Sequence, residues 1–338
     1  MRTKTAFLAF LLALIAASPA FAWGSKGHQY VGAIADGLLL HTKAGTQAQI
    51  ILGYSLATAA KWADCVRSVQ EISPGVFKFT IDPSHPEYTA PCTAFETPDE
   101  EARMEDYARR NWDNCPHRPK HGCHEEYHFA DVDIEHSDYR RSYAGTSDHD
   151  IVSAINAAIL VMQGKPAPQP FSIKDKKEAL LLIAHFVGDM HQPLHVGAIY
   201  LDASGNKVDA EGQGVDLDKT GTAGGNFILD GSTNLHSEWD AIPDSLGAKP
   251  TKAILAGARA VPNTAGPIDQ LAANWASDTV VESHDAYAGM SYVPAGFHKW
   301  TASFADRSKY LTDKARLQEQ QVERAGKRLA ELLKRLLP

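Results

Sequence analysis

Two histidine–aspartate pairs stand out because the members of each pair are four residues apart. His185 and Asp189 lie in EALLLIAHFVGDMHQPLH, and His236 and Asp240 lie in NLHSEWD. Residues four apart on a helix point from the same face, one turn above the other. An imidazole and a carboxylate in an apolar helix are costly unless a partner compensates them, and a divalent metal does so better than a salt pair. The repeated spacing, with His195 in the loop that follows the first pair, therefore predicts a metal site.

Other histidines and aspartates at expected helix ends enlarge this set. The candidate ligands are His28, Asp64, His128, His185, Asp189, His195, His236 and Asp240. Each residue alone could be a core side chain bonded to a neighbour, but eight together favour metal. They are too many for one tetrahedral ion, so we expect two or three zinc ions. Such a cluster suits phosphoester hydrolysis, in which paired ions about 3.5–4 Å apart generate hydroxide and a neighbouring ion stabilises the leaving oxygen.

Competing catalytic motifs are weak or missing from the sequence. It contains no G-x-S-x-G serine-nucleophile motif, and the glycine-rich residues 221–225 are not followed by the lysine of a phosphate-binding P-loop. The cysteine-bearing loop holds His117, His121 and His124, which follow no metal-ligand pattern. We interpret these three as solvated loop side chains.

The elements that must position the candidate ligands are mostly helices. In the central one, the spacing of Ser172 and Asp175 is typical of a helix start, and Pro193 ends the helix before His195. Apolar periodicity predicts further helices, at residues 23–40, 46–67, 99–112, 148–163, 233–241, 251–260, 268–287 and 304–336. We expect an irregular, disulfide-tied segment over residues 72–127 and a hairpin or loop over residues 197–225. With few strands and no internal repeat, the expected fold class is mainly α.

The first 22 residues have the features of a secretory signal peptide. Arg2 and Lys4 precede an apolar run at residues 6–17, and Ala-Phe-Ala at residues 20–22 fits a signal-peptidase site. Cleavage there would leave Trp23 as the first residue of a single domain, residues 23–338. With no other candidate membrane segment, we expect a secreted or periplasmic product without a membrane anchor. The four cysteines fit two disulfides in an oxidising compartment, although their pairing cannot be read from the sequence.

The charge of the chain argues against broad electrostatic adhesion to nucleic acid or to anionic membranes. The 338 residues include 33 basic and 41 acidic side chains, a formal net charge of −8. Without Arg2 and Lys4 the balance is 31 against 41, or −10. A phosphate-bearing substrate remains compatible with this charge, because bound zinc ions would add positive charge at the site itself.

Several motifs, in this order, resemble those of the S1/P1 nuclease family. They are WGSKGH at 23–28, WAD at 62–64, HF at 128–129, HFVGDMHQPLH at 185–195, GGN at 224–226 and NLHSEWD at 234–240. The resemblance implies a mostly helical, zinc-dependent endonuclease with a trinuclear zinc site. Such an enzyme cleaves single-stranded DNA and RNA to 5′-phosphate products and also acts on 3′-nucleotides. No stable protein partner is implied.

The resemblance also implies a ligand set for each of three zinc ions. The first ion would be held by Asp64, His128, His185 and Asp189. The second would be held by the free amino group and carbonyl oxygen of Trp23, with His28 and the bridging Asp189. The third, more open ion would be held by His195, His236 and Asp240.

Four further residues match substrate-binding positions of the family. Phe129 would stack on the base, Asp131 would bind its edge, Asn226 would help to form the pocket, and Arg67 would contact phosphate. The predicted catalytic residues are Asp64, Asp189 and Arg67. The alternative for the substrate residues is a packed core phenylalanine and a surface arginine.

Two features depart from the family pattern, and two other functions compete. The separation of Asp64 and His128 is long, and residues 197–223 resemble an insertion beside the pocket, which bears on base preference and substrate length. A zinc-dependent phospholipase C would use similar ligands, but HF, Asp131 and GGN favour a base pocket. An exported zinc-binding protein would bind the metal without turnover.

Overall fold

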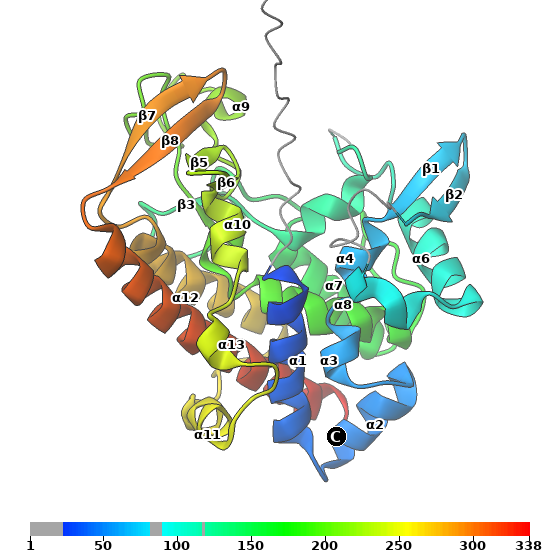
Figure 1. Ribbon diagram of the computed structural model, residues 1–338. Coiled ribbons are helices and arrows are strands. Elements are labelled where there is room, and N and C mark those ends of the chain that lie inside the picture. The colour runs from blue at the N-terminus through cyan, green and yellow to red at the C-terminus, as the bar shows by residue number, and fades with distance from the viewer. Residues whose placement is uncertain (1–22, 82–89, 117–118) are drawn as a thin grey trace, which may run out of the picture.

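The central helix α8 (Lys176–Asp189) is buried from Glu178 to its end, and other helices surround it (Figure 1). The computed structural model describes residues 23–81, 90–116 and 119–338. Helix α8 starts at Asp175, whose side chain accepts a hydrogen bond from the Glu178 N–H at 2.8 Å. The expected start at Ser172 is wrong. Arg110 binds the carbonyl and hydroxyl of Ser172, and the capping pair lies one turn later, at Asp175 and Glu178.

Helices make up most of the regular structure, which confirms the mainly α fold class. The α-helices are α1 (Gly24–Leu39), α2 (Lys43–Leu52), α3 (Leu56–Ala59), α4 (Trp62–Val66), α6 (Pro98–Arg110), α7 (Ile151–Met162), α8, α9 (Leu217–Thr220), α10 (Leu235–Asp240), α11 (Lys252–Ala260), α12 (Leu271–Ala286) and α13 (Arg307–Leu336). Short 3-10 helices are η1 (Ala90–Phe95), η2 (Cys123–His128), η3 (Pro193–His195), η4 (Asp244–Leu246) and η5 (Ile268–Gln270).

Within the described residues, the strands form three small sheets. They are β1 (Val69–Ser73), β2 (Val76–Phe79), β3 (Val132–Asp133), β4 (Gly197–Ala198), β5 (Ile228–Asp230), β6 (Thr233–Asn234), β7 (Met290–Gly296) and β8 (Lys299–Phe304). Antiparallel β1 and β2 form a hairpin, and β3 pairs in parallel with β4. The four-stranded sheet has the order β6-β5-β8-β7, in which only β5 and β8 are parallel. Ile228 on β5 lies opposite Trp300 on β8.

The single helix expected over residues 46–67 is wrong, because the segment contains three helices. Gly53 ends α2 in the left-handed conformation, with φ of 83°. Ser55 caps α3, and Asp36 of α1 accepts hydrogen bonds from the N–H groups of Leu56 and Ala57 at 3.0 and 3.1 Å. These bonds tie the start of α3 to α1 and turn the chain, so that α4 points Asp64 at α8.

The cysteine-bearing segment is more ordered than expected. It contains the β1–β2 hairpin and α6, and disulfides join Cys65 to Cys92 and Cys115 to Cys123. The interpretation of His124 as a solvated side chain is wrong, since it is buried beside Tyr107. His121 is half-buried, and His117 lies outside the described residues.

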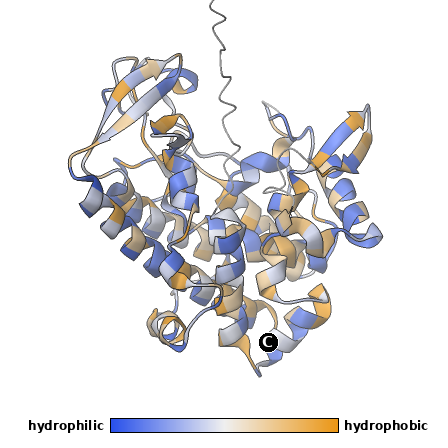
Figure 2. Cartoon of the chain, viewed as in Figure 1, coloured by the Kyte–Doolittle hydropathy of each residue, from blue (hydrophilic) through white to orange (hydrophobic). Residues whose placement is uncertain are grey.

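The main hydrophobic core fills the space between α1, α7, α8, α12 and α13, and a second cluster lies under the four-stranded sheet. Helix α13 alternates hydrophobic and hydrophilic residues along its length (Figure 2), so one face packs inward while the other remains in solvent. No helix within the described residues is long and apolar enough to cross a membrane. The leader expected over residues 1–22 lies outside these residues.

Gly326 marks the closest approach of α13 to α1. A Cβ at this position would lie 2.5 Å from the Cβ of Ile34 and 3.1 Å from the carbonyl oxygen of Val31. Neither atom can move without the backbone of α1. Alanine is favoured over glycine in a helix by about 1 kcal/mol, but overpacking costs about 1–3 kcal/mol.

We therefore expect Gly326→Ala to lower the free energy of unfolding, as measured by urea denaturation. Gly257→Ala on α11 is the matched control, because the nearest atoms there belong to the flexible carboxylate of Glu323. The control should be as stable as the wild type or slightly more stable. Equal stability of the two variants would contradict close α1–α13 packing as the reason for glycine at position 326.

Candidate metal centre and adjoining pocket

All eight predicted ligand side chains converge on one buried region at the ends of several elements. Helix α1 contributes one of them, α4 one, the end of η2 one, α8 two, η3 one and α10 two. They are His28, Asp64, His128, His185, Asp189, His195, His236 and Asp240, and every one is buried. They form three overlapping or adjacent groups, each compact enough to surround a metal ion.

Asp189 lies at the centre of the first two groups. Its Oδ1 is 3.0 Å from His28 Nε2, and its Oδ2 is 3.0 Å from both His128 Nδ1 and His185 Nε2. Asp64 approaches from the other side, with its oxygens 3.7 Å from His185 Nε2 and 3.9 Å from His28 Nε2. The two oxygens of Asp189 thus point toward different ligand groups, as a carboxylate that bridges two ions must do.

The third group lies beside the first two. His195 Nε2 and His236 Nε2 are 3.1 Å apart, and the oxygens of Asp240 lie 3.8 and 3.6 Å from them, respectively. His236 and Asp240 face the same side of α10, as their four-residue spacing predicts. Two imidazoles and one carboxylate leave room for a further ligand, so this group suits an open catalytic position.

Backbone carbonyls determine which nitrogen faces the centre in three of the five histidines. The Nδ1 atoms of His185, His195 and His236 lie 2.6, 2.9 and 2.8 Å from the carbonyl oxygens of Ala60, His128 and Gly224. A carbonyl only accepts, so each Nδ1 carries the proton and, in the neutral ring, each Nε2 presents a lone pair.

This arrangement fits a metal better than it fits a hydrogen-bond network. The lone pairs of His195 Nε2 and His236 Nε2 face each other at 3.1 Å, which is repulsive unless a cation lies between them. Both oxygens of Asp64 and one oxygen each of Asp189 and Asp240 are buried and make no hydrogen bond within the described residues. Buried oxygens of this kind are the usual ligands of divalent ions.

The electrostatics differ between the two sides of the centre. Burial disfavours a charged His185, but the carboxylates of Asp189 and Asp64 outweigh it and raise the pKa of this imidazole to about 9. Burial and the neighbouring His195 lower the pKa of His236 to about 3, and burial raises the pKa of Asp240 well above its usual value. The negative charge is therefore concentrated around Asp189, the carboxylate that would be shared by two ions.

Trp23 is fully buried against the same region. Its indole Nε1 donates to the carbonyl oxygen of Gly188 at 2.7 Å, and its backbone N–H donates to the Asp240 carboxylate. A Cβ at Gly188 would lie 2.9 Å from His28 Nδ1, so only glycine allows His28 to pack this closely. The structure thus brings the backbone nitrogen of Trp23 to the ligand cluster.

A pocket of about 460 Å³ opens beside His128, His195 and His236. All four predicted substrate residues line it, namely Arg67, Phe129, Asp131 and Asn226. Phe129 and Asn226 are half-buried, which is inconsistent with Phe129 as a packed core side chain. Arg67 lies 3.4 Å from Glu125, measured from its Nε to Oε1.

Asp131 is held at the wall of this pocket. Its carbonyl oxygen accepts a hydrogen bond from the Tyr200 hydroxyl at 2.7 Å, and the Gly224 N–H donates to its carboxylate. Burial outweighs that N–H and raises the pKa of Asp131 to about 6. Tyr200 belongs to the segment that resembles an insertion, so this segment buttresses the pocket wall.

Sequence reasoning missed several residues of the site. Gln192 is buried and donates from Nε2 to Asp240 Oδ1 at 2.9 Å, while its Oε1 accepts from the Leu194 N–H at 2.6 Å. Its position between Asp189 and His195 was the available signal. Glu126 and Phe227 also line the pocket, and no motif pointed to either of them.

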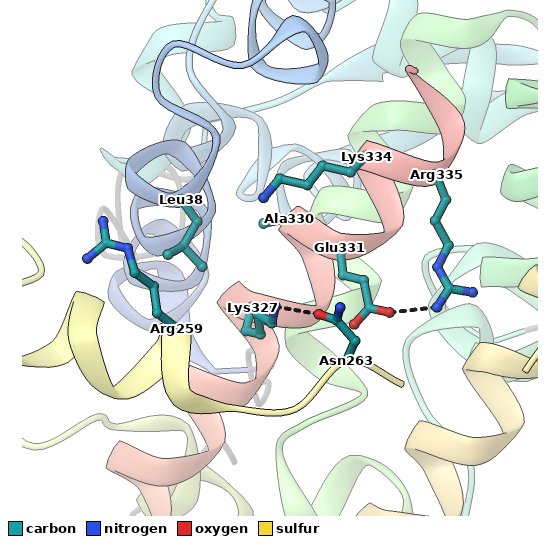
Figure 3. A pocket seen from close by; sticks show the side chains of 8 residues that line it. All are labelled: Leu38, Arg259, Asn263, Lys327, Ala330, Glu331, Lys334 and Arg335. Carbon is teal, nitrogen blue, oxygen red and sulfur yellow. Dashed lines mark hydrogen bonds and ion pairs between the residues drawn. The ribbon is translucent and has the colours of Figure 1, made fainter. Parts of the chain in front are cut away.

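A second cavity, of about 420 Å³, lies between α11, α13 and the end of α1 (Figure 3). Two of its four basic side chains have local partners: Lys327 donates to Asn263 at 2.6 Å, and Arg335 pairs with Glu331 at 2.7 Å. None of the metal-ligand groups found among the described residues lies there. The pocket beside His128, His195 and His236 is therefore the candidate substrate site.

A substitution of Gln192 tests whether its hydrogen bond to Asp240 orients that carboxylate for metal binding. We expect Gln192→Leu to weaken metal binding about 10- to 100-fold, because Asp240 loses the donor that orients it. Competition with a chromogenic chelator measures this affinity. Gln321→Leu is the matched control, since Gln321 is also buried but its side chain makes no hydrogen bond to a ligand within the described residues. Unchanged affinity in Gln192→Leu would contradict an orienting role.

The raised pKa of Asp131 predicts a pH-dependent contribution to stability. A carboxyl group whose pKa is higher in the folded chain than in the unfolded chain favours the fold while protonated, and that advantage is lost as the pH rises from about 4 to about 6. Relative to Asp131→Asn, the wild type should lose about 1–2 kcal/mol of unfolding free energy over this range, allowing for partial exposure. Urea denaturation of both proteins at pH 4 and pH 7 measures the change, and a pH-independent difference would contradict it.

Comparison with known proteins identifies the family. The sequence matches the S1/P1 nuclease family over residues 23–338. It is also similar to Endonuclease 3 of Arabidopsis thaliana, with 31% identity over 114 residues that make up 33% of this chain and 33% of that protein. The chain thus aligns with about a third of the length of that relative. Because the family match covers nearly all of the chain, this protein belongs to the S1/P1 nuclease family of metal-dependent nucleases.

Proposed function

We propose that the protein is a zinc-dependent endonuclease that hydrolyses single-stranded DNA and RNA to products with 5′-phosphates, and that it also removes phosphate from 3′-nucleotides. Family membership implies nuclease activity and therefore a nucleic-acid substrate. The observation that carries the finer proposal is the placement of three metal-ligand groups beside one pocket lined by an aromatic, an acidic and a basic side chain.

The proposed ligand sets are those that the family resemblance implies, and the convergence of these side chains supports them. Asp64, His128, His185 and Asp189 would hold one zinc ion. Trp23, through its free amino group and carbonyl oxygen, would hold a second with His28 and Asp189. His195, His236 and Asp240 would hold the third. Zinc in these sites supplies Lewis acidity and activates water for attack on phosphorus.

The side chains of the protein have three roles in this mechanism. Asp64 and Asp189 would bring negative charge that keeps the paired ions together, and His185, bonded through Nδ1 to the Ala60 carbonyl, would direct a fixed lone pair at one of them. Arg67 lines the pocket and would contact a phosphate oxygen. The residues thus orient the phosphodiester before reaction, which removes much of the entropic barrier.

Phe129 and Asp131 would recognise the base. Stacking on an aromatic ring contributes about 1–3 kcal/mol per base and tolerates every base. A duplex hides the base faces, so this mode of binding favours single strands. Asn226 at the pocket wall and Asp131 at the base edge would add hydrogen bonds.

Two other functions remain candidates for the same metal groups. A zinc-dependent phospholipase C could use similar ligands, but the half-buried Phe129 beside Asp131 suits a planar base better than a lipid head group. An exported zinc-binding protein would need no pocket beside its ligands.

The two disulfides support a secreted or periplasmic location. The division into a leader (residues 1–22) and a single domain (residues 23–338) stays a prediction.

One experiment separates these functions. Purified protein whose N-terminus has been sequenced is analysed for metal and then assayed on single-stranded DNA, RNA, a 3′-nucleotide, duplex DNA and phosphatidylcholine. The proposal expects zinc, a chain that begins at Trp23, and turnover of the first three substrates. Hydrolysis of phosphatidylcholine alone would favour the phospholipase, and bound zinc without turnover would favour the binding protein.

Asp189→Asn tests the bridging carboxylate. We expect turnover to fall to background and the metal content to drop, because one oxygen that faces a ligand group becomes an amide nitrogen. Mass spectrometric metal analysis and an assay on single-stranded DNA measure both effects. Asp269→Asn, an exposed position on η5, is the control and should behave as the wild type. Near-wild-type turnover with full metal content in Asp189→Asn would refute the assignment.

A further inference from the structure

We infer that Phe297, at the tip of the β7–β8 hairpin, is a second stacking site for a base of single-stranded nucleic acid, a few nucleotides from the base in the pocket. This inference rests on the proposed function, because it assigns part of the strand-binding surface of that same site. It concerns a residue for which neither the sequence motifs nor the metal centre has a use.

Phe297 is far more exposed than an aromatic side chain needs to be. It is 93% exposed, in the turn between β7 and β8. Leaving a phenylalanine in water forgoes about 1.5–3 kcal/mol of burial free energy. In this turn His298 adopts a positive φ of 52°, which is uncommon for a residue with a side chain.

A chain of rings connects Phe297 to the pocket. Phe227 lines the pocket, and its ring centroid is 4.6 Å from that of His298. The His298 ring is in turn 6.5 Å from the Phe297 ring, and the two planes meet at 74°. Two steps between neighbouring rings thus lead from the pocket wall to the exposed tip.

The backbone fixes the hairpin tip against this wall. His298 Nε2 donates to the carbonyl oxygen of Gly221 at 2.8 Å. The Trp300 N–H donates to the carbonyl oxygen of Phe227 at 3.0 Å, so β8 is bonded directly to the pocket-lining segment. Phe297 is therefore held at a set distance from the pocket. Stacked nucleotides repeat about every 3.4 Å along a strand, so a strand leaving the pocket reaches the tip within a few nucleotides.

The surroundings of Phe297 favour nucleic acid as the occupant. A protein or membrane partner requires a broad apolar patch, whereas the turn that carries Phe297 consists of Gly296, His298 and the exposed Lys299, and Val293 is the other large hydrophobic residue exposed on this hairpin. An aromatic side chain with a lysine two residues along the same turn matches the combination of base stacking and phosphate attraction that binds single strands. The net charge of −8 makes long-range attraction of a strand weak, so stacking must contribute much of the binding.

The test compares substrates that can and cannot reach the hairpin tip. We expect Phe297→Ala to raise the KM for a 20-nucleotide oligothymidylate about 5- to 100-fold. Hydrolysis of a 3′-mononucleotide, which is too short to leave the pocket, should be unchanged. Phe297→Trp should retain the wild-type KM because it keeps an aromatic ring. Ile50→Ala is the matched control, since Ile50 is 76% exposed on α2, away from the pocket.

Each result decides between the inference and the proposed function. An unchanged oligonucleotide KM in Phe297→Ala would overturn the inference while leaving the nuclease proposal intact. If the wild type hydrolyses neither substrate, the nuclease proposal fails. In that case fluorescence anisotropy with labelled oligothymidylate decides, and equal binding by the wild type and Phe297→Ala overturns the inference. Weaker binding by Phe297→Ala, with Ile50→Ala unchanged, supports it.

Discussion

The burial of one carboxylate, that of Asp189, is the constraint on which the rest of the site depends. It lies in a helix that is buried on every side, and an uncompensated charge there would cost several kcal/mol or more. The compensation comes from three imidazoles at 3.0 Å, carried by α1, the end of η2 and α8 itself. Parts of the chain far apart in sequence must therefore meet at this point, and metal ions shared by the carboxylate would make their meeting favourable.

The precision of the cluster comes from the backbone. Carbonyl oxygens of Ala60, His128 and Gly224 each hold one histidine by its Nδ1, so the direction of every Nε2 lone pair depends on a different segment. Ala60 ends α3, and its position depends on the break of the helix at Gly53 and on the bonds from Asp36. The packing of α3 against α1 thus determines the orientation of the His185 ring on α8. The geometry of the ligand cluster therefore depends on helices that carry few of the ligands themselves.

The sequence could predict the ligands better than it could predict the elements that carry them. The pairs His185–Asp189 and His236–Asp240 were recognisable because helical geometry converts a spacing of four into one face, a purely local rule. The break near Gly53 has local signals in that glycine and in Ser55, which apolar periodicity ignores, whereas the pairing of β8 with β5 depends on contact with a distant segment. His124 shows the same limit: its loop is polar in composition, yet its side chain packs into the core because α6 and a disulfide fold that loop inward. For Gln192 the sequence offers only its position between two ligands, because a single amide carries no pattern of its own.

An acidic protein that acts on a polyanion must bind its substrate by local means. Around the pocket, Glu125, Glu126 and Asp131 outnumber Arg67, so the protein side chains alone would repel a phosphate. Cations held by the ligand groups would reverse that charge at the reacting phosphate only, over a distance that salt screens little. The rest of the strand would then be held through its bases, on aromatic rings such as Phe129. In the proposed function, metal would hold the phosphate and aromatic rings would hold the bases. Such a division would link a preference for single strands to the exposure of the bases, and it would reconcile the charge of the chain with a polyanionic substrate.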